Sequence, residues 1–86
     1  MAEPSFALKI VTPDEVFFEG RAVHVSAPGT VGSFGVLANH APFITSLAKG
    51  KLSLRDESGQ TKSFTIEGGF FEVSKNRALV LTDSVK

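Results

Sequence analysis

The amino-acid sequence predicts an all-β protein, built as an antiparallel β-sandwich or barrel. Three observations indicate this class. Apolar and polar residues alternate with a period of two in several short runs, a pattern typical of strands with one buried face and one hydrated face. Residues that favour turns stand between these runs. No segment shows the spacing of an amphipathic helix. Many short strands separated by turns are typical of sandwiches and barrels.

The first half of the chain contains three predicted strands. Phe6, Leu8 and Ile10 share one face of the first run, opposite a lysine. In the third run Val23 and Val25 alternate with polar residues. Proline or glycine marks the end of each run, because these residues favour turn geometry. The predicted breaks are at residues 12–15, 19–20 and 27–29.

Two predicted hairpins follow in the second half. Leu52 and Leu54 alternate with polar residues before a loop at residues 56–60, whose glycine can adopt a positive φ angle. Phe64 and Ile66 continue the pattern after that loop. A second turn is predicted at residues 74–77, where Asn76 is the residue that best tolerates the left-handed region.

Two further segments are apolar on both faces. In residues 68–73, Phe71 and Val73 face one side and Phe70 faces the other, while residues 78–81 are apolar throughout. Either these strands lie between two packed layers, or one of their faces contacts a partner. The sequence leaves both interpretations open.

Composition restricts the function. A chain of 86 residues predicts one domain, residues 1–86. Nine basic and nine acidic residues give no net charge, which argues against a nucleic-acid or polybasic membrane-surface protein. There is no cysteine for a disulfide or a thiolate site. The first residues lack the features of a secretory or transit peptide, and no apolar run approaches the length of a membrane span. These features predict a soluble protein of a bacterial-type cytoplasm.

Residues 32–43, GSFGVLANHAPF, form the one stretch that does not read as a plain strand. His40 and His24 are the only histidines, and no HxH or HExxH spacing or neighbouring carboxylate accompanies His40. The glycines lack the lysine and the following helix of a phosphate-binding loop. We therefore interpret the stretch as a tight, apolar contact corner with a packed or interfacial histidine, and expect no metal or cofactor there.

The same corner, Gly32-Ser33-Phe34-Gly35-Val36-Leu37-Ala38-Asn39-His40-Ala41-Pro42, resembles the signature G-x-[LF]-G-[IV]-[LY]-P-x-H-A-P of the ε subunit of F-type ATP synthases, called δ in mitochondria. Ala38 replaces a proline that is common in the family. The resemblance extends along nearly the whole chain. It includes the opening strand at residues 8–13, the F-x-G strand at residues 16–20, the strand after the corner at residues 50–52, the G-G-x-x-E-V segment at residues 66–73 and the last strand at residues 79–83.

This resemblance implies a ten-stranded antiparallel β-sandwich without catalytic activity or cofactor. It implies a rotor subunit in the central stalk, at the cytoplasmic face of a bacterial membrane, that binds the γ subunit, rests on the c-ring and helps to couple ion translocation to ATP synthesis. Gly32, Ser33 and Phe34 then approach the polar loops of the c subunits, although relatives often have an acidic residue in place of Ser33. Residues that fall at γ-facing positions are Thr12, His40 and Thr45. The helical hairpin that follows the sandwich in most relatives is expected to be absent.

Two rival interpretations belong to other functional classes. A stand-alone β-sandwich that binds a peptide or a glycan at a sheet edge explains the strands, but not the two family signatures. An enzyme built on His40 predicts a measurable turnover that is lost in His40→Ala.

Overall fold

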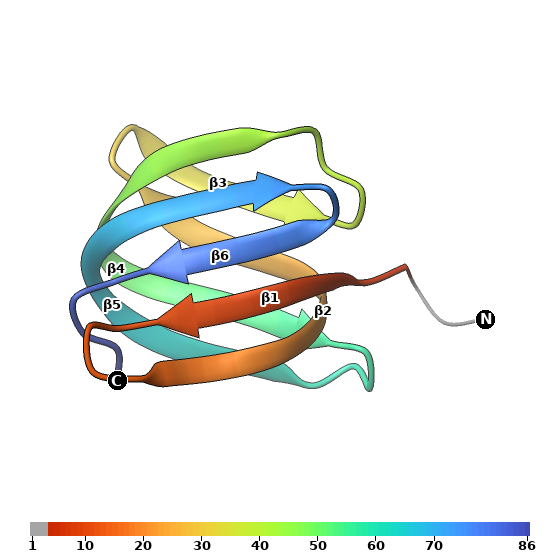
Figure 1. The fold of residues 1–86 in the computed structure, drawn as a ribbon, viewed down its shortest axis with the longest axis horizontal. Helices are drawn as coiled ribbons and strands as arrows, with labels where there is room; N and C mark the ends of the chain where they lie inside the picture. Colours follow the sequence, from red (N-terminus) through yellow and green to blue (C-terminus); the bar gives the residue numbers. More distant parts are fainter. Residues whose placement is uncertain (1–3) are drawn as a thin grey trace.

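Six strands and no helix make up the described part of the chain, residues 4–86, in the computed structural model (Figure 1). The predicted all-β class is therefore confirmed. The N-terminal stretch, in which no targeting signal is predicted, begins with residues 1–3, which lie outside the described residues. The strands are β1 (Phe6–Val11), β2 (Val16–Gly29), β3 (Gly32–Leu37), β4 (Phe43–Asp56), β5 (Thr61–Ser74) and β6 (Arg77–Leu81).

The six strands form one sheet that closes on itself. Their order is β1-β6-β5-β4-β2-β3, and β1 also pairs with β2. The three 14-residue strands β2, β4 and β5 are long enough to bend and to take part in both layers of the fold. In β2, residues 16–22 pair with β1, whereas residues 24–29 pair with β3. In Figure 1 β4 and β5 curve around the left side of the molecule, and β2 curves around the right side.

Two details of the expected sandwich differ from the structure. It has six continuous strands rather than ten, because each long strand passes through its bend without a break. The expected fully antiparallel pairing is wrong for β1 and β6, which run parallel from Ala7↔Arg77 to Val11↔Leu81. A tight hairpin imposes antiparallel pairing only on strands that are neighbours in the sequence, and β1 and β6 meet through closure of the sheet instead.

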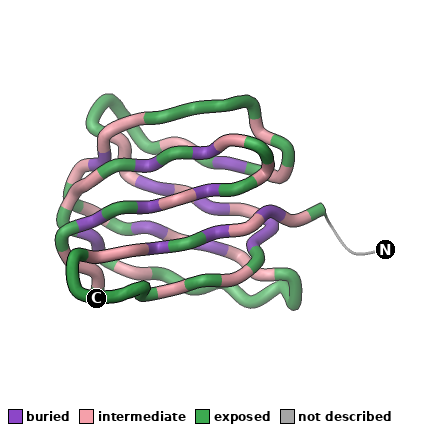
Figure 2. The backbone as a smooth tube through the Cα atoms, in the orientation of Figure 1, coloured by how far each residue is buried: buried purple, intermediate pink, exposed green. Residues whose placement is uncertain are grey.

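The core lies between the two curved layers and follows the predicted alternation. Buried and exposed residues alternate along most strands in Figure 2. Burial of these apolar side chains is the main favourable term in folding, at about 25 cal/mol per Å² of apolar surface. The buried cluster consists of Phe6, Leu8, Ile10, Ala22, Val25, Ala27, Val36, Leu47, Leu52, Leu54, Ile66, Phe71, Val73, Ala78 and Val80.

A bend at Gly68 and Gly69 lets β5 serve both layers. Ile66 and Phe71 are both fully buried although they are five positions apart, and positions an odd number apart in a regular strand face opposite sides, so the inward face changes between them. The φ angles of Gly68 and Gly69 are +89° and +126°, values that favour glycine. The β4–β5 register is the same on both sides of this point, so the feature is a bend without a bulge.

The outer faces of β5 and β6 are exposed. Phe70 and Leu81 are cross-strand partners with 57% and 45% of their surface accessible, while Phe71 and Val80 beneath them are buried. The interpretation that residues 68–73 and 78–81 lie between two packed layers is therefore wrong for the face that carries Phe70 and Leu81. That face remains open for contact with a partner.

Candidate contact surface

The prediction of one tight corner over residues 32–43 is wrong: residues 32–37 form the regular strand β3, because its glycines fit an unbroken ladder with β2, and His40 lies in the β3–β4 loop beyond it. The tight turn is the tip of the β2–β3 hairpin. Gly29 pairs with Gly32 across the two-residue turn of Thr30 and Val31. A Cβ on Gly29 would lie 2.6 Å from the carbonyl oxygen of Gly32, so the two strands approach too closely there for a side chain. Val31 is 96% exposed at the tip. This hairpin tip is thus narrow and accessible.

Hydrogen bonds fix this tip to β4. The Thr30 hydroxyl oxygen lies 2.7 Å from the Ser46 hydroxyl oxygen, and the Thr30 amide donates to the Ser46 carbonyl at 3.2 Å. Ser33 is exposed, whereas Phe34 is partly buried and packs edge-on against the rings of Phe43 and Phe71. Gly32 and Ser33 are therefore accessible to a partner, and Phe34 mainly supports the corner from beneath.

His40 packs against its own loop. Its Nδ1 atom lies 2.7 Å from the carbonyl oxygen of Ala41, and its ring centroid lies 5.8 Å from that of Phe43. The side chain is half-buried. Within residues 4–86 there is no group of three or more His, Cys, Asp or Glu residues that could hold a metal ion. The geometry agrees with a packed histidine.

The structure does not bring Thr12, His40 and Thr45 together in one site. Thr12 closes the β1–β2 turn, where its hydroxyl oxygen accepts from the amides of Asp14 and Glu15 at 3.3 and 3.2 Å. In Figure 1 this turn and the β3–β4 loop that carries His40 lie at opposite ends of the molecule. Thr45 is half-buried and lies opposite Phe71 in the β4–β5 ladder.

An apolar patch lies beside Thr12 on the outer face of β1, β6 and β5. Val11, Leu81 and Phe70 are successive partners across β1, β6 and β5. Together with Pro13 they line a hollow of about 510 Å³ that also includes Thr12. We call Val11, Pro13, Phe70 and Leu81 the outer patch. Its signal in the sequence was the apolar residues on both faces of the last two strands.

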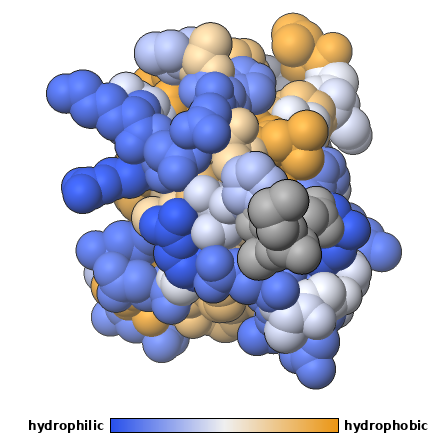
Figure 3. All heavy atoms as spheres, turned by 90° about the vertical axis from the view of Figure 1, so that its right-hand side faces the viewer, coloured by the Kyte–Doolittle hydropathy of each residue, from blue (hydrophilic) through white to orange (hydrophobic). Residues whose placement is uncertain are grey.

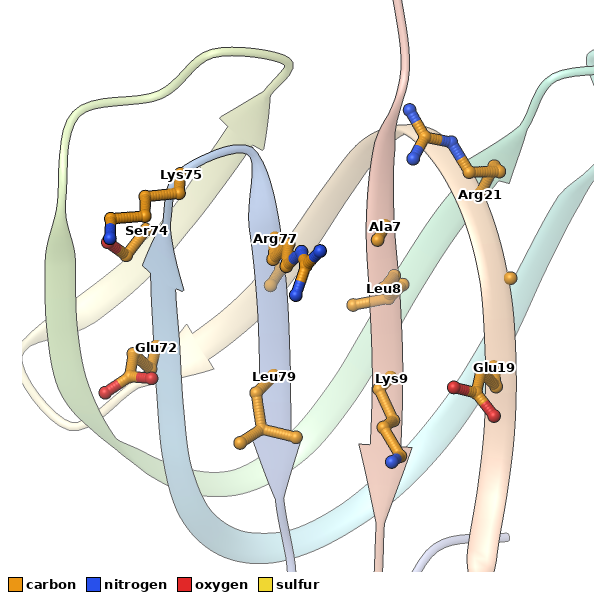
Figure 4. Close-up of a pocket in the computed structure, with 12 residues that line it drawn as sticks. Ala7, Leu8, Lys9, Glu19, Arg21, Glu72, Ser74, Lys75, Arg77 and Leu79 are labelled. Atoms are coloured by element: carbon orange, nitrogen blue, oxygen red, sulfur yellow. The ribbon is translucent and has the colours of Figure 1, made fainter.

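A larger, charged hollow of about 900 Å³ lies on the same layer (Figure 4). It extends across β5, β6, β1 and β2, and Lys9 and Glu19 face each other on neighbouring strands there. Its charged lining residues are Lys9, Glu19, Arg21, Glu72, Lys75 and Arg77. Sequence analysis did not identify this hollow, because pairing of the first and last strands brings its residues together. A mixed set of exposed charges suits polar contacts at the rim of a protein interface.

The pKa of Asp56 is lowered from its ordinary value, but this residue lies in the β4–β5 turn, away from both hollows. The main cause is a hydrogen bond from the Ser58 hydroxyl, and the amides of Gln60 and Ser58 also donate to the carboxylate. The perturbation therefore reflects the structure of a turn. No helix in residues 4–86 is long and apolar enough to cross a bilayer.

Comparison with known proteins gives one consistent family. The model of the family described as "ATP synthase, Delta/Epsilon chain, beta-sandwich domain" matches residues 5–86. The ATP synthase epsilon chain of Chlorobium limicola is 45% identical over 84 residues, covering 98% of this chain and 96% of the relative. That of Chlorobaculum tepidum is 50% identical over 86 residues, with the same coverage of both chains.

A solved structure agrees with these matches. A chain in the mitochondrial ATP synthase of Euglena gracilis, described as OSCP/F1/c-ring in rotational state 1, superimposes with a TM-score of 0.91 at 25% identity. The match covers 98% of this chain, which spans about half, 54%, of the Euglena chain. The epsilon chains thus match this chain in sequence over nearly their whole length, and the Euglena chain matches it in fold. This chain therefore belongs to the family of ATP synthase delta/epsilon chain β-sandwich domains.

Proposed function

We propose that this chain is a rotor subunit in the central stalk of an F-type ATP synthase. In this role it links the γ subunit to the c-ring and helps to couple ion translocation to ATP synthesis. The support is the 45–50% identity to epsilon chains, which the chain matches over 96% of their length. The chain catalyses no reaction itself, so its function depends on the surfaces it presents to its partners. It is peripheral to the membrane, and we place it at the cytoplasmic face of a bacterial cell membrane.

The outer patch is the main structural observation that supports this proposal. Phe70 and Leu81 are large apolar side chains that lie side by side and are about half exposed. Apolar side chains gathered with a charged rim are typical of a protein–protein interface. Thr12 borders this patch, which supports a γ-facing role for Thr12.

The tip of the β2–β3 hairpin, which carries Gly32 and Ser33, lies at the same end of the molecule as the β1–β2 turn in Figure 1, whereas the β3–β4 loop with His40 lies at the opposite end. We propose that Gly32 and Ser33, with Phe34 beneath them, approach the polar loops of the c-ring, because this tip is narrow and projects from the sheet. His40 and Thr45 are proposed to contact γ at a point separate from Thr12. A γ subunit that contacts all three must therefore extend along the sandwich rather than bind at one end.

The family's count of ten strands also remains a proposal. Dividing each of β2, β4 and β5 at its bend, and counting the segment bridged through Ile66↔Val85, yields ten segments. Under this count the six continuous strands and the ten-stranded description refer to the same fold.

Calorimetric titration of the chain into purified γ subunit tests the proposed function. We expect one-to-one binding, weakened at least about tenfold by Phe70→Asp, since burying an unpaired carboxylate is costly. Ser63→Asp, an exposed position on β5 outside the outer patch, is the matched control and should bind as the wild type does. A folded wild-type chain without affinity for γ would refute the rotor assignment. Equal binding by Phe70→Asp would remove the outer patch from the interface.

A further inference from the structure

The strand β3 has an open edge. Of the six strands within residues 4–86, it alone pairs with a single neighbour, β2. Alternate residues of a strand direct their N–H and C=O groups to opposite sides, so half of these groups in β3 point away from β2. A row of unpaired backbone groups is a template on which another strand can add.

This chain covers a comparable edge elsewhere. Residues 84–86 lie against the first half of β5, where the Thr65 amide donates to the Lys86 carbonyl at 2.9 Å and the Lys86 amide donates to the Thr65 carbonyl at 3.0 Å. The Glu67 amide donates to the Ser84 carbonyl at 3.2 Å. The edge of β5 is thus satisfied within the chain, whereas no strand within residues 4–86 pairs with the outer edge of β3.

The usual protection of an open edge is missing from β3. Proteins that keep such an edge free of partners place lysine, proline or a bulge on it. The sequence of β3 is GSFGVL, and its register with β2 is regular from Gly29↔Gly32 to His24↔Leu37. No Asp, Glu, Lys or Arg occurs between Arg21 and Lys49, so the neighbouring segments add no charge either. An unprotected edge of this kind is expected to be covered by a partner in the native complex.

The surroundings of the edge indicate the chemistry of its partner. Leu37 is 58% exposed, and the ring of Phe34 lies 5.3 Å from that of the partly exposed Phe43. Ser33 and Gly35 are small, so a second backbone can approach closely. In Figure 3 hydrophobic side chains gather in the upper part of this end of the molecule, where the β3–β4 connection lies in Figure 1. A partner strand with uncharged, partly apolar side chains matches this surface.

We propose that β3 binds an extended, uncharged segment of the γ subunit by strand addition. This inference rests on the proposed function and specifies how γ contacts the β3 end of the molecule. The c-ring loops are assigned to the tip at Gly32 and Ser33, so the γ segment takes the remainder of the edge toward the apolar, exposed Leu37. A second copy of the chain is a less suitable partner for this edge, because the six residues of β3 give an edge only about 20 Å long. That length is too short to supply alone the roughly 1,200–2,000 Å² of a stable interface.

Residue-resolved amide hydrogen exchange tests the inference directly. In the isolated chain, alternate amides of β3 should exchange fast, because they lack a partner, while those bonded to β2 are protected. In the complex with γ the fast set should slow by at least about tenfold, giving continuous protection along the strand. A side-chain contact on the outer patch would leave the alternation in β3 unchanged.

Three variants separate strand addition from other contacts. Leu37→Lys adds the kind of charge that protects natural edges and should weaken γ binding about tenfold or more. Leu37→Thr keeps a residue that favours strands, without charge, and should bind within about threefold of the wild type, because backbone groups carry the contact. Ser63→Lys places the same charge on an exposed position of β5 and serves as the control.

The outcomes distinguish this inference from the proposed function. If the complex forms but the alternate β3 amides still exchange fast, strand addition is refuted and the rotor assignment stands. If no complex forms with a folded chain, both fail. If protection of β3 appears in the isolated chain and rises with its concentration, the occupant is a second copy and the assignment to γ is wrong.

Discussion

At the scale of single residues, two glycines with positive φ have different environments. Gly69, at the bend of β5, has a φ of +126°, and a Cβ there would overlap the carbonyl oxygen of Leu81 and lie 2.9 Å from the Cα of Thr82. Gly59, in the β4–β5 turn, has a φ of +91° with no atom within 4 Å of a Cβ. Both positions favour glycine because of their φ angles, but only at position 69 is there no room for a side chain.

Gly69→Ala should therefore destabilise the protein by more than about 3 kcal/mol, since backbone strain adds to a clash with backbone atoms that cannot move aside. Gly59→Ala should cost about 1 kcal/mol, from strain alone. Urea denaturation measures both. Equal losses in the two variants would show that the crowding at Leu81 is relieved by a small shift of β6.

A second residue-scale prediction concerns Asn76, whose side chain joins three segments. Its Oδ1 accepts from the Asn39 amide at 2.8 Å, and its Nδ2 donates to the Ser5 carbonyl at 2.9 Å. Asn76→Gly keeps the left-handed backbone, whose φ is 60°, but removes both bonds. We expect a loss of about 1–2 kcal/mol in the free energy of unfolding.

Lys75→Gly is the matched control for Asn76→Gly. Lys75 has a φ of 51° in the same turn and is exposed. Its replacement should change the free energy of unfolding by less than about 0.5 kcal/mol, because relief of strain offsets the added freedom of the unfolded chain. If both variants lose the same amount, the side-chain bonds of Asn76 contribute nothing measurable.

At the scale of elements, the β4–β5 hairpin depends on the charge of Asp56. Its Oδ1 accepts from the Ser58 hydroxyl at 2.6 Å and from the amides of Ser58 and Gln60 at 2.9 and 3.0 Å. These bonds, led by that of the Ser58 hydroxyl, lower the pKa of Asp56 below its ordinary value of 3.8. The ionised carboxylate therefore stabilises the turn that sets the register of the longest ladder in the sheet.

The pH dependence of this contribution has a definite sign. Because the folded-state pKa of Asp56 is depressed, the stabilisation is fully present well above the unfolded-state pKa and is lost as the pH falls through the folded-state value. The stability difference between the wild type and Asp56→Asn should accordingly be constant near neutral pH and shrink below about pH 4. Denaturation at a series of pH values measures it. A difference that is independent of pH would contradict the role of the charge.

At the scale of the whole molecule, the apolar core rather than surface charge maintains the fold. The net charge is zero, and the ion pair between Lys49 and Glu67, at 3.6 Å, is well exposed at both ends. Exposed pairs contribute little to stability and are screened by salt. The melting temperature should change by less than about 2 °C between roughly 0.02 and 0.3 M NaCl. A larger decrease would assign a structural role to the charged hollow around Arg77.

The candidate contacts show how far sequence analysis reached. The exposed tip at Gly32 and Ser33 was predictable, because glycine, proline and the absence of charge are local signals, but the regular strand β3 that continues from it to Leu37 was not. The separation of Thr12 from His40 was not, because it depends on where two distant turns lie after the sheet has closed. The outer patch was half predicted: the sequence showed that Phe70 faces the side opposite Phe71 and that residues 78–81 are apolar throughout, but not that the face with Phe70 and Leu81 is left uncovered.

The sequence by itself determined the all-β class, the alternating core residues, the turns at Gly59 and Asn76 and the uncharged stretch that contains β3. These properties depend on residues close together in the chain, where the period of two and the φ preference of single residues are decisive. The tertiary structure alone decided the parallel pairing of β1 with β6, the bend at Gly69 that places one strand in two layers, and the open edge of β3. These features arise from pairing between distant segments, and no local pattern specifies which distant strand completes a ladder and which edge is left without one.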